Sequence, residues 1–190
     1  MKPLALLASL ALAAPASAQY LDSPFKYNYL EVNYAATDID RFPEQLDGLG
    51  GRLSVAVEGA VRAFAQFDEM TTGSGLTRDR RLDLQAGVGF MTSPANSVDM
   101  ILDLKYLRGE QQRSGDNIIK HGYGIELGTR SLLHPLVELD VSGEYREWFK
   151  SELGARAAVR FLVTENFSVG ARVAWFETQE MLTAGLRFSL

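Results

Sequence analysis

The feature that most constrains this chain is a regular alternation of apolar and polar residues that recurs ten times along it. Side chains of a β-strand point alternately to its two faces, so each segment predicts a strand with one apolar face. Each segment is about eight to eleven residues long, the length that a tilted strand needs to cross a bilayer. The apolar positions lie within Leu30–Ala36, Leu53–Val57, Val61–Phe67, Leu82–Phe90, Val98–Tyr106, Tyr123–Thr129, Val137–Tyr145, Leu153–Phe161, Phe167–Trp175 and Leu182–Leu190.

The second face of these segments is charged, and two folds fit that pattern. A soluble antiparallel sandwich would turn the charged face to water and bury the apolar face. A transmembrane barrel would turn the apolar face to lipid and the charged face to its lumen. No stretch after Ala18 is apolar for long enough to form a membrane-spanning helix, so the chain would cross a membrane only as strands.

Connections and aromatic residues favour the barrel. Long polar connections over 37–49, 69–79 and 109–120 alternate with short ones at 59–60, 91–97, 132–136 and 162–166, as in outer-membrane barrels. Aromatic residues of the apolar face collect at strand ends, which suits two belts at the membrane interfaces. We therefore predict an all-β fold, a single ten-stranded antiparallel transmembrane β-barrel with short periplasmic turns and longer extracellular loops. The outer belt would hold Tyr34, Phe67, Tyr106, Tyr123, Tyr145 and Trp175, and the inner belt Phe90, Phe161, Phe167 and Phe188.

The first residues have the order of a secretory signal: Lys2, an apolar stretch over 4–14, and small residues over 16–18. We predict a signal peptide over 1–18 and one barrel domain over 19–190; the alternative, an uncleaved anchor, has a short apolar stretch against it. Removing Lys2 leaves 18 basic against 24 acidic residues, a net charge of −6, which gives no indication of nucleic-acid binding. The absence of cysteine excludes disulfide scaffolds and thiolate metal sites.

The carboxyl terminus resembles the β-signal by which outer-membrane barrels are recognised for assembly. The matching positions are Thr183, Gly185, Phe188 and Leu190, where Leu190 replaces the commoner terminal aromatic residue. The resemblance implies that the barrel-assembly machinery is a partner. Its alternative interpretation is an ordinary amphipathic strand.

Three strand sequences resemble the small Ax-type outer-membrane barrels, whose architecture is OmpA-like. They are YNYLEVNYAATD over 27–38, LQAGVGF over 84–90 and YGIELGTRS over 123–131. This resemblance covers most of the predicted mature chain and implies a ten-stranded barrel in the cell outer membrane. Because the motifs are strand patterns, they imply no activity.

Charged residues of the polar face predict a narrow lumen filled by ion pairs. A ten-stranded barrel is close to the size at which side chains fill the lumen. Charged side chains buried there need oppositely charged partners. Acids of the fourth to seventh strands would face arginines of the eighth to tenth strands across it. A plugged structural barrel is therefore one interpretation, and a narrow pore for ions or small solutes is the other. The predicted network comprises Asp83, Asp99, Asp103, Glu126, Glu138, Asp140, Glu144, Arg156, Arg160, Arg172 and Arg187.

Catalytic candidates are few, and we predict no enzyme. His121 lies near Ser114 and Asp116 in the sequence, so a Ser/His/acid hydrolase at the outer mouth is a third hypothesis. Gly87-x-Gly89 lies within a strand with no helix after it, so it predicts no nucleotide cofactor. Arg78, Arg80 and Arg81 lie at the expected height of lipopolysaccharide phosphates, or form a solvated rim. The expected partners are outer-membrane lipid and lipopolysaccharide, with the barrel as a monomer and without any cofactor.

Overall fold

A computed structural model describes residues 23–39, 45–72, 79–113 and 116–190 of the chain. The predicted signal peptide over 1–18 lies outside these residues and stays a prediction. The described residues contain no helix long and apolar enough to cross a membrane. The strands are β1 (Tyr29–Ile39), β2 (Leu46–Glu58), β3 (Val61–Thr72), β4 (Arg80–Ala95), β5 (Val98–Arg113), β6 (Asp116–His134), β7 (Val137–Glu147), β8 (Ser151–Thr164), β9 (Phe167–Phe176) and β10 (Gln179–Ser189).

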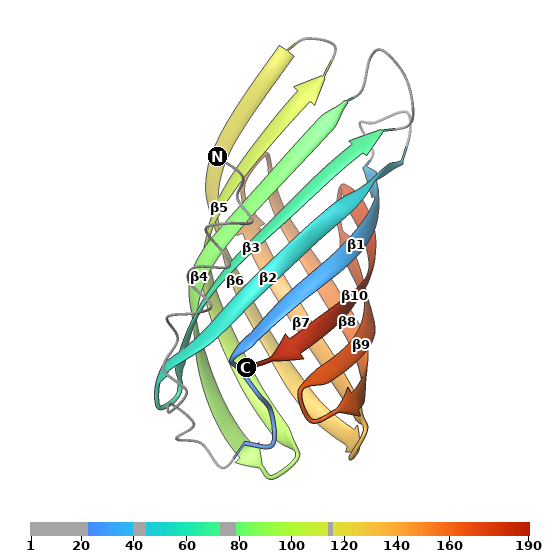
Figure 1. Cartoon of the computed structure of the whole chain (residues 1–190). Helices are drawn as coiled ribbons and strands as arrows, with labels where there is room; N and C mark the ends of the chain where they lie inside the picture. The colour runs from blue at the N-terminus through green and yellow to red at the C-terminus, as the bar shows by residue number, and fades with distance from the viewer. Residues whose placement is uncertain (1–22, 40–44, 73–78, 114–115) are drawn as a thin grey trace.

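The ten strands form one closed antiparallel barrel, which confirms the predicted fold class (Figure 1). Each strand pairs with its neighbours in sequence, and β1 closes the sheet by pairing with β10. At this seam Asn33 lies opposite Gly185, and the Leu190 amide donates to the Asn28 carbonyl at 2.8 Å. Closure leaves no free sheet edge along the body of the barrel, so the backbone groups are paired within the wall.

Strand alternation sorts the side chains as the sequence predicts. In β1 Glu31 and Asn33 are buried in the lumen, whereas Val32 and Tyr34 between them are exposed on the outer surface. The same order of buried polar and exposed apolar residues continues around the wall. The apolar side chains therefore cover the outside of the barrel and the charged ones fill its inside.

The connections at the inner end of the barrel are all short, but those at the outer end are not all long, since β7 and β8 are joined by three residues and β9 and β10 by two. The turns between β2 and β3, β4 and β5, β6 and β7, and β8 and β9 each have two residues. Gly59 in the first of them has φ 51°, a left-handed conformation that glycine adopts without steric cost. Tight turns of this kind at one end match the predicted periplasmic side.

Several strands run further than predicted. The segment 109–120, predicted as a loop, is mostly strand, because β5 continues to Arg113 and β6 begins at Asp116. The prediction ended the strands where lipid-facing apolar residues stop, but hydrogen-bonded pairing needs no lipid. The hairpin of β5 and β6, yellow in Figure 1, therefore rises above the rest of the barrel.

Gly122 of β6 lies close to the end of β7, and this contact allows the packing of the barrel wall to be tested. A Cβ at Gly122 would lie 1.8 Å from the Glu147 carbonyl oxygen, whereas the nearest atom to a Cβ at Gly143 is at 3.9 Å. We expect Gly122→Ala to destabilise the barrel by about 1–3 kcal/mol through overpacking, and Gly143→Ala to have little effect. Urea unfolding of the two refolded variants measures this, and equal stability would contradict the described contact.

Candidate functional site

The lumen holds ten cationic and ten carboxylate side chains among the described residues. They lie in it because every second residue of each strand points inward, and most are almost fully buried. The cations are Arg52, Arg62, Arg81, Lys105, Arg130, Arg146, Arg156, Arg160, Arg172 and Arg187. The carboxylates are Glu31, Asp68, Asp83, Asp99, Asp103, Glu126, Glu138, Asp140, Glu144 and Glu152.

The largest group of ion pairs, which we call the Glu31 cluster, links opposite walls near the inner end. It comprises Glu31, Glu138, Asp140, Arg130, Arg160, Arg172 and Arg187. Glu31 of β1 accepts from Arg187 at 2.8 Å and from Arg172 at 2.9 Å. Arg160 of β8 bridges Glu31 and the β7 carboxylate of Glu138. Side chains from six strands therefore meet across the bore.

Two smaller clusters lie beside it. In the Glu126 cluster, Lys105 and Arg156 both contact Glu126 and Glu144, with Arg156 3.1 Å from Glu126 and 2.5 Å from Glu144. In the Asp103 cluster, Asp103 accepts from Arg62 of β3 at 2.7 Å and lies 3.4 Å from Arg52 of β2. Each of these carboxylates is held by two cations, as buried charges require.

The structure places all eleven residues of the predicted network in the lumen, but the predicted division into an acidic and a basic wall is wrong. Cations also come from β2 to β7, and acids also come from β1, β3 and β8. Several pairs join adjacent strands, as Glu138 and Arg160 do in direct register. The residues that the network omitted show the same inward alternation, so the pattern that identified its members also marks them. They are Glu31, Arg52, Arg62, Asp68, Arg81, Lys105, Arg130, Arg146 and Glu152.

Residues 23–28, ahead of β1, close the inner end of the lumen. Phe25 and Tyr27 pack against Ala56 and Met91 in a small apolar cluster inside the mouth. The guanidinium of Arg130 lies 5.5 Å from the Phe25 ring centroid and 5.0 Å from that of Tyr27. This aromatic seal is absent from the sequence predictions, because the residues precede the alternating pattern.

Asp99 anchors that seal rather than joining an ion-pair cluster. Its carboxylate accepts from three hydroxyls, those of Ser23 at 2.6 Å, Tyr27 at 2.5 Å and Ser93 at 2.7 Å. Burial raises the pKa of the Tyr27 phenol above its ordinary value, so the phenol stays protonated and donates. Asp99 is thus satisfied by neutral donors.

The outer end is closed by the segment between β7 and β8. Trp148 is folded inward, its indole donates to the Lys120 carbonyl at 3.3 Å, and its ring contacts Phe149. Arg81 lies 5.2 Å from the Trp148 ring and pairs with Asp83 at 2.8 Å. Arg146 pairs with Glu152 at 2.5 Å close by. Both ends of the lumen are therefore lined by aromatic rings stacked on arginines.

The three arginines predicted at the outer rim have different environments. Arg81 is 3% exposed and points into the lumen, so the prediction that it contacts lipopolysaccharide is wrong. Strand alternation puts its neighbour Arg80 on the outer surface, where it pairs with Glu69 at 2.9 Å. Arg78 lies outside the described residues.

The predicted assembly-signal residues divide between the two faces of β10 and its end. Thr183 and Gly185 face the lumen, and Phe188 and Leu190 face outward. Phe188 packs on Phe167 with ring centroids 5.1 Å apart. These positions do not test recognition by the assembly machinery, which stays a prediction.

The two histidines form no catalytic arrangement with the described residues. His121 Nδ1 lies 2.5 Å from the Tyr106 hydroxyl on the outer surface, and His134 Nδ1 accepts from the Leu136 amide in a turn. Ser114, the predicted partner of His121, lies outside the described residues. Within the described part of the chain, no group of three or more His, Asp or Glu side chains is placed to hold a metal ion.

The spaces left in the lumen are small. One cavity of about 60 Å³ lies at the middle, lined by Arg52, Arg62, Asp103 and Arg130 among others. Another of about 60 Å³ lies at the outer mouth beside Trp148 and Arg146, and one of about 20 Å³ lies near Glu31. Cavities of this size hold a few water molecules each.

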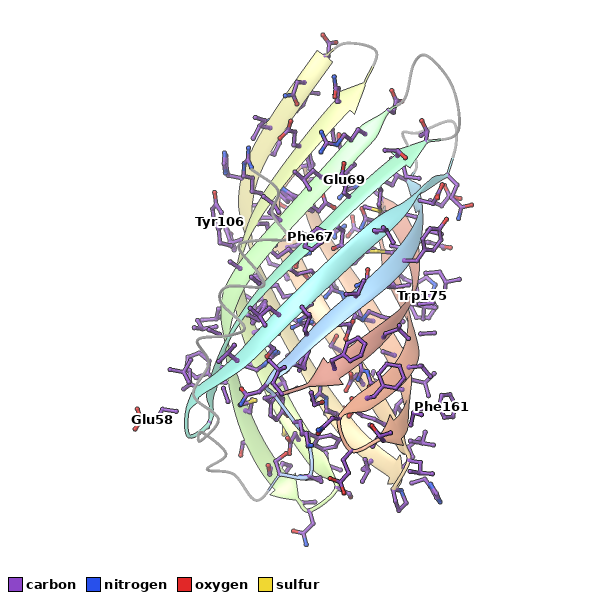
Figure 2. All side chains as sticks on the ribbon, in the orientation of Figure 1. Glu58, Phe67, Glu69, Tyr106, Phe161 and Trp175 are labelled. Atoms are coloured by element: carbon purple, nitrogen blue, oxygen red, sulfur yellow. The ribbon has the colours of Figure 1, made fainter. Side chains whose placement is uncertain are left out.

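The outer wall carries the two predicted aromatic belts. Figure 2 shows Tyr106 in the upper part of the barrel, and Trp175 above Phe161 on the opposite side. Belt hydroxyls reach polar groups further out, as Tyr34 does with Asp47 at 2.6 Å. On β9 the nine residues from Phe167 to Trp175 span ~26 Å along the strand, or ~20 Å after a ~40° tilt, close to the roughly 25 Å apolar band of such barrels.

A closed antiparallel barrel with an apolar, aromatic-belted exterior and a polar lumen defines the class of this chain. It is a transmembrane β-barrel of the outer-membrane type, because lipid-exposed apolar walls suit a bilayer and a closed sheet leaves no unpaired edge in it.

No protein-family model matches the sequence, and no curated protein matches it significantly, so the resemblance to the Ax-type barrels stays a prediction. Solved structures with a similar fold include the KdgM porin, 10% identical over 84% of this chain and 99% of that chain, with a TM-score of 0.47. Neisserial surface protein A is 16% identical over 85% and 96%, at 0.45. The Ail attachment invasion locus protein of Yersinia pestis is 17% identical over 84% and 97%, at 0.39. At these values the likeness concerns the barrel shape alone.

Glu31 provides a test of the buried ion pairs. Glu31→Gln leaves Arg160, Arg172 and Arg187 short of a shared carboxylate in the lumen. We expect a loss of about 3–5 kcal/mol of unfolding free energy, since breaking a buried pair leaves an uncompensated charge. The control Glu69→Gln, which breaks an exposed pair with Arg80, should cost less than about 1 kcal/mol. Urea unfolding compares the two, and similar losses would argue against a stabilising lumen network.

Proposed function

We propose that this chain is a non-conducting outer-membrane barrel that anchors extracellular hairpins at the cell surface. The observation that carries the proposal is closure of the lumen along its length. Ion-pair clusters cross the bore from near its inner end to its middle, and aromatic residues stacked on arginines lie at each end. A ten-stranded barrel is narrow enough for side chains to fill it in this way.

The part left to meet partners is the outer surface. Residues 116–122 of β6 extend beyond its pairing with β7, and Ile118 and Ile119 there are 46% and 45% exposed. Exposed apolar side chains on a raised hairpin suit contact with another molecule more than they suit the fold.

Two further partners belong to this proposal. Arg80 on the outer surface keeps guanidinium donors that suit a lipopolysaccharide phosphate. The barrel-assembly machinery would recognise the terminal residues Thr183, Gly185, Phe188 and Leu190. An enzymatic role has no support from the surroundings of His121 and His134.

A narrow channel is the second candidate, favoured by the polar cavities in the middle and at the outer mouth of the lumen. For conduction the side chains between those cavities would have to move apart. Arg156→Ala or Arg172→Ala would then alter the current.

Planar-bilayer recording of the refolded mature chain separates these two functions. We expect no single-channel current from a barrel whose folding has been verified by its mobility shift on heating, because the bore is filled with paired side chains. Resolved single-channel currents would contradict the sealed barrel and establish the channel.

The hairpin gives a second test. Replacing residues 110–119 by a short turn, which keeps Gly109 and Lys120 beside Trp148, should leave the heat-induced mobility shift unchanged, because residues 116–119 of β6 pair with β5 and not with β7. A control that removes the paired segment 123–129 should abolish folding. Failure of the shortened hairpin to fold would give the hairpin a structural role and contradict the proposal that it is free to bind.

A further inference from the structure

Within the three ion-pair clusters, which extend from the inner end to the middle of the lumen, the charges do not balance. The Glu31 cluster has four arginines and three carboxylates, the Asp103 cluster has two arginines and one carboxylate, and the Glu126 cluster has two of each. Together they hold eight cations against six carboxylates, an excess of two positive charges. Two further buried carboxylates, Asp99 and Asp68, are held by neutral donors instead of by cations: Asp99 accepts from three hydroxyls and Asp68 from the Gln66 amide.

The middle cavity lies where the three clusters meet. Six arginines line it, and its three carboxylates, Asp103, Glu126 and Asp140, each already accept from two cations. The lining also includes the Ser142 hydroxyl, which donates to Glu126, and the buried Tyr29, whose ring centroid lies 3.9 Å from the Arg187 guanidinium carbon. The arginines are Arg52, Arg62, Arg130, Arg156, Arg172 and Arg187.

Donors around this cavity outnumber acceptors. Four of the six arginines keep a buried N–H group with no acceptor among the described residues: Arg52 Nε, Arg62 Nε, Arg130 Nη1 and Arg156 Nε. An arginine has five such donors and no acceptor, so neighbouring arginines cannot satisfy one another. Unpaired charge and unmet donors in one buried place both call for a negative ion.

We propose that the middle cavity binds a small inorganic anion, of the size of a halide or a compact oxyanion, held by the surrounding guanidinium groups. A cavity of about 60 Å³ suits one such ion and excludes large organic anions. This site is independent of what the extracellular hairpins contact. Because aromatic residues lie over both ends of the lumen, the anion is supplied during refolding in the test.

The test is refolding of the full mature chain in sodium chloride, sodium phosphate or sodium gluconate at equal ionic strength. An anion that binds only the folded state stabilises it, so we expect the midpoint of heat-induced unfolding to rise by about 5–10 °C in chloride or phosphate relative to gluconate. Equal midpoints in all three salts would overturn the proposal.

Matched variants distinguish this site from a general salt effect. Arg52→Gln removes one surplus cation that makes a single long contact with Asp103, and it should abolish the anion-dependent rise. Arg80→Gln removes one cation from the outer surface and should retain the rise. An undiminished rise in Arg52→Gln would overturn the proposal.

Crystallography of the wild-type barrel provides a test that does not depend on the folding of Arg52→Gln. Wild-type barrel refolded and crystallised in bromide should show an anomalous peak in the middle cavity between Arg52, Arg130 and Arg156. Well-resolved density there without an anomalous signal would mean that water alone occupies the cavity, which would overturn the proposal.

Discussion

Backbone hydrogen bonding in lipid is the constraint from which the rest of this structure follows. A strand in a bilayer has no water to satisfy its amides and carbonyls, so the sheet must close on itself, as β1 does with β10. Closure forces every second side chain of ten strands into one narrow bore. The composition of the lumen, and the cost of filling it with charge, are consequences of that closure.

The lumen meets this cost by grouping its charges around shared carboxylates. Glu31, Glu138 and Asp103 each contact two or more cations from different strands, so one residue ties several walls together. Cross-bore links of this kind make the interior a part of the fold. The outer wall, by contrast, depends on lipid and carries the aromatic belts.

Much of the architecture was predictable from the sequence, because strand alternation is a local property. It predicted the number of strands, the two faces of each strand and the belts that include Tyr106 and Phe161. The sequence prediction ended β5 too early, because strand pairing continues past the last apolar residue. It also assigned Arg81 to the outer rim, although the position of Arg81 in the strand alternation points its side chain into the lumen. It also missed Phe25 and Tyr27, which lie before the first alternating residue.

The sequence by itself determined that alternate residues are apolar and charged, and hence that the chain forms a closed barrel with a charged interior. Only the tertiary structure decided which charges meet, because the partners of Glu31 lie more than a hundred residues away and are set by strand register around the barrel. It likewise decided that Asp99 is held by hydroxyls and that cations exceed carboxylates at the middle of the lumen, since neither follows from the order of residues along one strand.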